Sequence, residues 1–256
     1  MGESPPPLRR RVREGGEPTG DELPPVRLGP VKFLLDERTT DPEEIKARVA
    51  EARAAGHAVA IHAVSEAEVA IAVTALAGPP HRSRDRSPNR IEHGSVIPNE
   101  MLADLRAAHI TVVGQPALIS LRGDVYLGDY PPESHGWLHR AASLVAAGIG
   151  YAAGSDAPIG DPSPFLGFRA ARTRVTPSGA VLGPEEALAT QPALAAFTQW
   201  PAQAIGASHD LGTLSPGKSA DIAVLDPDML GDPTAGLGGR QARLTLVEGR
   251  IAWRRT

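Results

Sequence analysis

Four polar residues recur along the chain at a regular interval, each at or near the end of a short apolar run. Lys32, His62 and His93 follow one another at intervals of 30 and 31 residues, and Asp156 comes 63 residues later. A (β/α)8 barrel uses about 250 residues for eight units, or about 31 per unit, and its active site lies at the C-terminal ends of the strands. The spacing therefore predicts polar side chains gathered at one edge of a parallel sheet.

Strand-like and helix-like segments alternate along this part of the chain, which is typical of a parallel α/β sheet. Short apolar runs predict strands at 31–35, 58–61, 90–93, 110–114 and 149–155. We expect helices at 42–52, 66–76, 98–105 and 138–147. Asp41 and Ser65 are suited to cap the first two helices. Residues 117–135 are rich in Gly, Pro and Asp, so we expect a long irregular loop there.

The chain changes character at both ends. Residues 1–28 hold runs of proline and arginine that cannot bury much apolar surface, so we expect a disordered tail. Residues 29–208 form the expected α/β body, and residues 209–256 form the expected part of a small β domain. After Asp156 we expect helices within 162–174, 184–197 and 201–205, followed by strands within 212–225 and 243–253. Five parallel strands indicate either a small open sheet or the C-terminal part of an eight-stranded barrel.

Composition limits the chemistry and the partners. The net charge is -4, which gives no reason to expect nucleic acid or an anionic membrane as a partner. Because the chain has no cysteine, a metal site has to use histidine, carboxylate or a modified lysine. No apolar stretch is long enough to cross a bilayer, and the N-terminus has no apolar signal sequence. We therefore expect a cytoplasmic protein with a small-molecule substrate.

The four recurring residues are candidates for a metal site. Neutral imidazoles such as those of His62 and His93 are common ligands of zinc and similar ions, although either residue could be a buried histidine bonded to backbone. Asp156 could bind a metal and accept a proton from water, or could be an ordinary turn or helix-capping aspartate. Lys32 can ligate a metal only when it is deprotonated or carboxylated, and most lysines in strands are simply solvated.

Several short motifs occur in a recognisable order from about residue 29 to the C-terminus. They include VKFLLDE at 31–37, RIEHG at 90–94, AGSDAP at 153–158 and GTLSPGKSADIAVLD at 212–226. The series resembles that of the amidohydrolase superfamily, in particular its family 3 branch of metal-dependent hydrolases. The resemblance implies a partial TIM (β/α)8 barrel made of about strands four to eight, followed by part of the family's small C-terminal β domain.

The resemblance also implies roles for the recurring residues. Lys32 falls on a lysine that is often carboxylated and bridges two metals, and His62 and His93 fall on ligands of one of them. Asp156 falls on the ligand of the other metal, which also acts as general base. The implied cofactor is a divalent metal, zinc in the first instance, with one or two ions in a full family site. The implied reaction is hydrolysis of a non-peptide carbon–nitrogen bond of an amide, formamide or cyclic amide by metal-activated water.

Three further residues, Arg122, Tyr126 and Arg174, could contact the substrate from loops near this site, or could have structural roles. The sequence also departs from the family pattern, because it has no His-x-His pair to complete the first metal site. The alternatives are a truncated, inactive remnant, or one chain of a split enzyme that needs a complementing N-terminal chain. A homo-oligomer and an unrelated small α/β binding domain are further interpretations.

Overall fold

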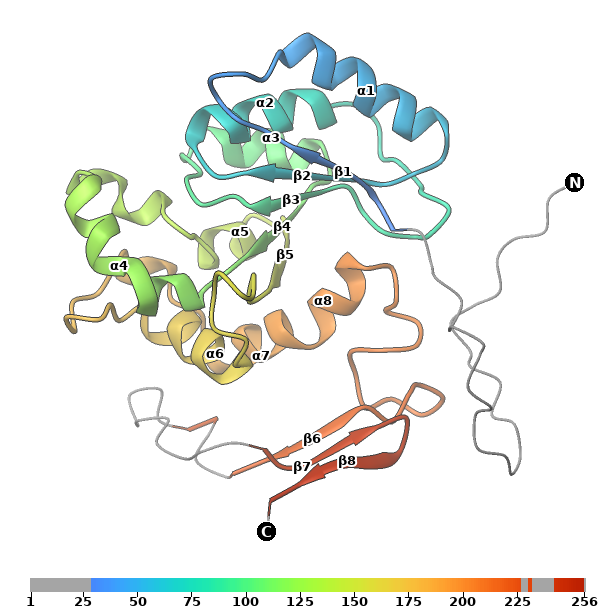
Figure 1. Ribbon diagram of the computed structural model, residues 1–256, viewed down its shortest axis with the longest axis vertical. Coiled ribbons are helices and arrows are strands. Elements are labelled where there is room, and N and C mark those ends of the chain that lie inside the picture. Colours follow the sequence, from blue (N-terminus) through green and yellow to red (C-terminus); the bar gives the residue numbers. More distant parts are fainter. Residues whose placement is uncertain (1–28, 227–229, 232–241, 256) are drawn as a thin grey trace, which may run out of the picture.

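The larger of two sheets contains five parallel strands. The structure, a computed structural model, describes residues 29–226, 230–231 and 242–255 (Figure 1). The strands are adjacent in chain order: β1 (Val31–Leu34), β2 (Val59–Ala63), β3 (Arg90–His93), β4 (Thr111–Gly114) and β5 (Gly150–Ala153). The predicted parallel α/β sheet is therefore confirmed. The expected disordered tail at 1–28 lies outside the described residues.

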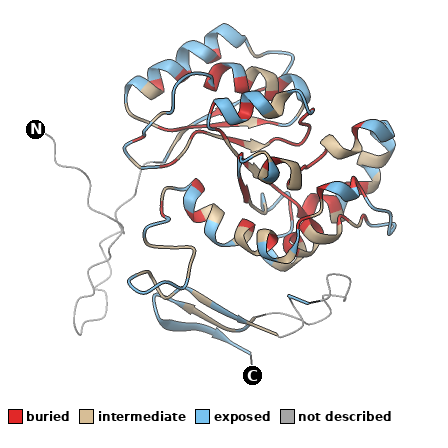
Figure 2. Cartoon of the chain, turned by 180° about the vertical axis from the view of Figure 1, so that it is seen from behind, coloured by how far each residue is buried: buried red, intermediate tan, exposed pale blue. Residues whose placement is uncertain are grey.

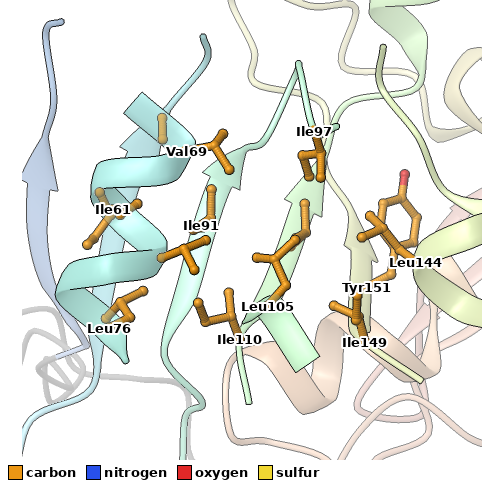
Figure 3. Packing of buried hydrophobic residues seen from close by; sticks show 14 of the residues in the cluster. Ile61, Val69, Leu76, Ile91, Ile97, Leu105, Ile110, Leu144, Ile149 and Tyr151 are labelled. Carbon is orange, nitrogen blue, oxygen red and sulfur yellow. The ribbon is translucent and has the colours of Figure 1, made fainter. Parts of the chain in front are cut away.

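One row across the sheet shows how its apolar face is built. Ile61, Ile91, Val112 and Tyr151 are partners in successive strands, and each is at most 4% exposed. Because partners in register point to the same side of a sheet, these four side chains share one face. Figure 3 shows residues of this row together with side chains of the covering helices. The core of the protein lies between this face and those helices.

The helices that join the strands supply the other half of this core. They are α1 (Pro42–Ala54), α2 (Glu66–Leu76), α3 (Met101–Ala107) and α5 (Ala142–Ala146). Asp41 caps α1 by accepting from the backbone N–H of Glu43 and Glu44, as predicted. Ser65 and Glu68 form the predicted capping box at the start of α2. Helix α5 is shorter than the predicted 138–147, because 138–141 pass along the sheet edge with Leu138 bridged to Val96.

The prediction of an irregular loop at 117–135 is wrong. Residues Ala117–Asp129 form helix α4, followed by a 3-10 helix, η1 (Pro132–Trp137). One of the two glycines that suggested a loop, Gly123, allows close packing, because a Cβ on Gly123 would come within 2.5 Å of the Thr176 side chain. The buried residues Leu118 and Ile119 hold the first turn of α4 in place. Tertiary contact therefore outweighs the low helix propensity of this segment.

Further helices and a second sheet complete the described chain. Helices α6 (Pro164–Thr173), α7 (Thr190–Phe197) and α8 (Gln199–Ala204) follow β5. The predicted continuous helix at 184–197 is interrupted, since Pro184–Glu186 form a 3-10 helix, η2, before α7 begins. Strands β6 (Ile222–Leu225), β7 (Ala242–Val247) and β8 (Arg250–Arg254) form an antiparallel sheet. The strand expected within 212–225 is thus confined to its last residues.

Burial differs between the two sheets. Figure 2 shows buried residues concentrated around the parallel sheet and its helices, whereas β6, β7 and β8 are intermediate or exposed. All five residues of β8 are exposed. Within the described ranges, no helix has both the length and the apolar character needed to cross a membrane. The division of the chain at residue 208 stays a prediction.

Candidate functional site

The polar residues that recur in the sequence lie on strands of the parallel sheet or directly after them. Lys32 is in β1 and His62 in β2, His93 is the last residue of β3, and Asp156 follows β5 by three residues. The strands are parallel, so their C-terminal ends share one edge of the sheet. His62, His93 and Asp156 are at that edge, and Lys32 lies deeper, opposite Ala60.

The rings of His62 and His93 are in contact. His62 has Glu92 as its partner in register, so regular alternation would point His93 to the opposite face. The backbone of His93 is left-handed instead, with φ of 78°, an uncommon conformation for a residue with a side chain. The two ring centroids lie 4.5 Å apart at an interplanar angle of 74°. This local break in the strand accompanies the pairing of two imidazoles that sequence periodicity alone would separate.

Gln115, directly after β4, contacts His93 of this pair and was not among the residues predicted for the site. Its Oε1 lies 2.9 Å from Nδ1 of His93, and its Nε2 donates to the carbonyl oxygen of Val113 at 3.0 Å. Because Nε2 is used as a donor, Oε1 is the acceptor, and Nδ1 of His93 carries the proton. Nε2 of a neutral His93 ring is then left with its lone pair. The signal available in the sequence was the position of this polar residue directly after a predicted strand.

Burial is the main cause that favours the neutral forms of two bases at this site. Burial lowers the pKa of His62, and the neighbouring His93 and Lys32 lower it further. Lys32 is exposed on the edge strand, yet partial desolvation of its ammonium group lowers its pKa, against the opposing effect of Glu92. Only a neutral imidazole can ligate a metal, and only a neutral amine can be carboxylated. The electrostatic environment therefore suits both residues to the expected chemistry.

Asp156 lies in a tight turn within electrostatic reach of this group. Its backbone is left-handed, with φ of 54°, and its carbonyl oxygen accepts from the N–H of Ile159 at 2.8 Å and of Gly160 at 3.1 Å. The Asp156 carboxylate raises the pKa of both Lys32 and His62, which opposes the effect of their burial. The turn thus places a negative charge near the two bases.

The imidazole side chains of His62 and His93 are of a type that binds divalent metals. Two imidazoles in contact, one of them oriented through its second nitrogen, are ligands suited to zinc and similar ions. In the part of the chain that the structure describes, no three His, Asp or Glu side chains are grouped so as to hold a metal ion. The described residues therefore offer His62 and His93 as imidazole ligands, and a third ligand from Lys32 requires its carboxylated form.

The three residues expected near the substrate differ in their surroundings. Arg174 is 1% exposed and donates to the carbonyl oxygens of Leu138, His139 and Leu182. These contacts support a structural role for Arg174 rather than contact with the substrate. Tyr126 is half-buried on α4, and burial raises its pKa. Arg122, on the same helix, is exposed. Helix α4 thus presents Arg122 to solvent, while Arg174 holds the backbone beneath.

Comparison with a protein-family model and with known proteins indicates the family of this chain. Residues 16–252 match the sequence model of the amidohydrolase family. An N-substituted formamide deformylase from Arthrobacter pascens is 30% identical over 202 residues, which cover 77% of this chain and 37% of the relative. Protein LONG AFTER FAR-RED 3 from Arabidopsis thaliana is 30% identical over 191 residues, which cover 72% of this chain and 32% of the relative.

A solved structure extends the comparison to the fold. The crystal structure of an uncharacterized metal-dependent hydrolase from Pyrococcus horikoshii OT3 matches with a TM-score of 0.64 at 26% identity. The match covers 76% of this chain and 39% of that protein. The matches therefore span less than two fifths of the length of each of these three proteins.

Proposed function

Because the chain belongs to the amidohydrolase family, we propose that it takes part in metal-dependent hydrolysis of a non-peptide carbon–nitrogen bond in an amide, formamide or cyclic amide. The observation that carries this proposal is the contact between His62 and His93, with Nδ1 of His93 fixed by Gln115. Such a pair leaves imidazole nitrogens with lone pairs at the C-terminal edge of a parallel sheet, where enzymes of this architecture keep their active sites. The name of the deformylase relative supports an N-substituted formamide as the first substrate to test.

The proposed barrel assigns β1 to β5 to strands four to eight of an eight-stranded barrel, and β6 to β8 to part of the small β domain. The unbroken parallel order of the five strands supports this assignment. So does the match of most of this chain to a minor part of a metal-dependent hydrolase. In such a barrel the face that carries His62 and Glu92 would be the inner one.

The proposed roles follow from the positions of the side chains. His62 and His93 would hold the divalent ion, with zinc as the first candidate, and Lys32 would add a ligand as a carbamate. The chemistry that such an ion supplies is polarisation of the substrate carbonyl and activation of water at neutral pH. Asp156 would take a proton from the attacking water and return it to the leaving nitrogen, so that an amide and water give a carboxylic acid and an amine.

Hydrolysis of N-butylformamide tests this function. The protein is stripped with a chelator, reloaded with zinc, and assayed for release of butylamine. We expect zinc-dependent release that falls by at least about 100-fold in His62→Ala and in Asp156→Asn, because a ligand and a general base are lost. His57→Ala is the matched control, since His57 lies just before the opposite end of β2. Equal rates in Asp156→Asn and wild type would contradict the proposal.

The second candidate is a chain that acts only with a complementing polypeptide. The observation that favours it is that the described residues group fewer than three His, Asp or Glu side chains as metal ligands. In that case the zinc-loaded chain alone would release no butylamine, and activity would appear on mixing with a separate chain that carries a His-x-His pair. Activity of the chain by itself would exclude this candidate.

A further inference from the structure

His139 is a buried histidine that the proposed mechanism does not use. It is 6% exposed, and neither of its ring nitrogens has a hydrogen-bond partner among the described residues. Buried polar groups in folded proteins are almost always paired, because leaving one unpaired destabilises the fold. Two unpaired nitrogens on one buried ring therefore call for a ligand or water as their partner.

The position of His139 connects it to the candidate site. Its backbone N–H donates to the carbonyl oxygen of Ser95 at 2.8 Å, and the neighbouring Leu138 is bridged to Val96. Ser95 is only two residues beyond His93, at the same edge of the sheet. A positive charge on His93 lowers the pKa of His139, so the two rings are within electrostatic reach. The backbone of His139 therefore lies beside the segment that follows His93.

The surroundings keep His139 neutral and fixed. Arg174 donates from Nη1 to the carbonyl oxygen of His139 at 2.9 Å and from Nη2 to that of Leu138 at 2.7 Å. Burial, together with the Arg174 charge, lowers the pKa of His139 to about 3. A neutral imidazole offers one N–H donor and one acceptor. The nearby Arg174 guanidinium is positively charged, so it favours a hydrogen-bond acceptor with negative charge at the N–H of the His139 ring.

A side chain from α4 covers this ring. The Tyr126 ring lies with its centroid 4.9 Å from that of His139, tilted by 44°. Tyr126 is half-buried at the surface, whereas His139 is beneath it. The two rings are therefore in contact, and Tyr126 is the more exposed of the two.

We propose that His139 is a substrate-binding residue whose neutral ring donates a hydrogen bond to the carbonyl oxygen of the scissile amide, with Tyr126 as a movable cover. This inference rests on the proposed function. The carbonyl oxygen gains negative charge as water adds to the carbon, and a fixed neutral donor backed by a buried cation stabilises that charge. The ligand class is an uncharged acyl group, such as a formyl group, that can enter once Tyr126 moves.

Two measurements test the role of His139. In the zinc-loaded enzyme we expect His139→Phe to lower kcat on N-butylformamide by about 100-fold, as loss of one such donor does, with KM changed far less. His139→Gln, which keeps a donor, should recover part of this loss, and His57→Phe serves as the control. Unchanged kcat in His139→Phe, or an equal loss in both His139 variants, overturns the proposal.

The second measurement does not depend on turnover. In Asp156→Asn protein with 15N-labelled histidine, N-butylformamide should shift a ring nitrogen resonance of His139, whereas n-butylamine at the same concentration should not. Absence of that shift overturns the proposal. If wild type hydrolyses no formamide, the proposed function fails, and this titration alone decides whether His139 binds the acyl group.

Discussion

His93 and Asp156 both have left-handed backbone at the sheet edge, and both depart from regular strand geometry there. A non-glycine residue with positive φ is uncommon, and such residues cluster at functional sites. The sequence was sufficient to identify these residues as candidates and to give their spacing. Their orientation was not, because alternation along β3 predicts that His93 and His62 point to opposite faces. Gln115, which contacts Nδ1 of His93, directly follows the next strand, and that position does not indicate which side chain it contacts.

Removal of the Gln115 contact should weaken metal binding without unfolding the protein. In Gln115→Leu the Nδ1 of His93 loses its acceptor, so we expect zinc affinity to fall by about 10- to 100-fold, the usual effect of losing such a supporting hydrogen bond. The measurement is competition for zinc with a chromophoric chelator. Gln115→Glu, which keeps an acceptor oxygen, should retain most of the affinity. Wild-type affinity in Gln115→Leu would show that Gln115 does not orient a ligand.

His139 should make stability depend on pH. Its pKa is lowered to about 3 in the folded chain, whereas an unfolded histidine has a pKa of about 6.5. Between these values the unfolded chain binds a proton that the folded chain does not, so the free energy of unfolding falls by about 1.4 kcal/mol per pH unit as pH drops below about 6.5. His139→Phe lacks this term. Urea unfolding at about pH 7 and about pH 5 should show a smaller loss of stability in His139→Phe than in wild type, and equal losses would contradict the assignment.

At the scale of elements, some helices could be predicted from local sequence signals, whereas others depend on tertiary contacts. The starts of α1 and α2 were predictable because Asp41 and Ser65 satisfy backbone donors within their own first turns. Helix α4 was missed because Gly123 suggests a loop, whereas its lack of a side chain leaves room for the distant Thr176. The start of α5 depends likewise on a distant residue, since Glu186 accepts from the backbone N–H of Ala141 and of Ser143, both at 3.0 Å.

Glu186 gives a direct test of such a long-range contact. Its side chain is 3% exposed and also pairs with the buried Arg140 guanidinium at 3.2 Å. Glu186→Gln would leave the Arg140 charge without its counter-ion, so we expect a loss of about 3–5 kcal/mol in the free energy of unfolding. The adjacent, exposed Glu185 offers a matched control, and Glu185→Gln should change stability by less than about 1 kcal/mol. Urea denaturation measures both, and similar values for the two variants would refute this role.

At the scale of the whole molecule, the sequence predicted the α/β class and the parallel sheet, and it predicted that the recurring polar residues lie at one edge of that sheet. These features follow from short apolar runs that alternate with helix-like segments, and that alternation can be read locally in the sequence. The closure of a barrel is different, because it depends on strands beyond the five that pair in the described chain. The proposed metal site also depends on more than local sequence, since His62 and His93 are in contact but the described residues group no third His, Asp or Glu with them.

The central claim is that the pair of His62 and His93 holds a divalent metal, and calorimetric titration of zinc into the chelator-stripped protein tests it most directly. We predict saturable binding by wild type and by the His57→Ala control, and loss of at least about 100-fold in affinity in His62→Ala and in His93→Ala. Zinc binding of equal strength and stoichiometry in wild type and in both site variants would contradict the account.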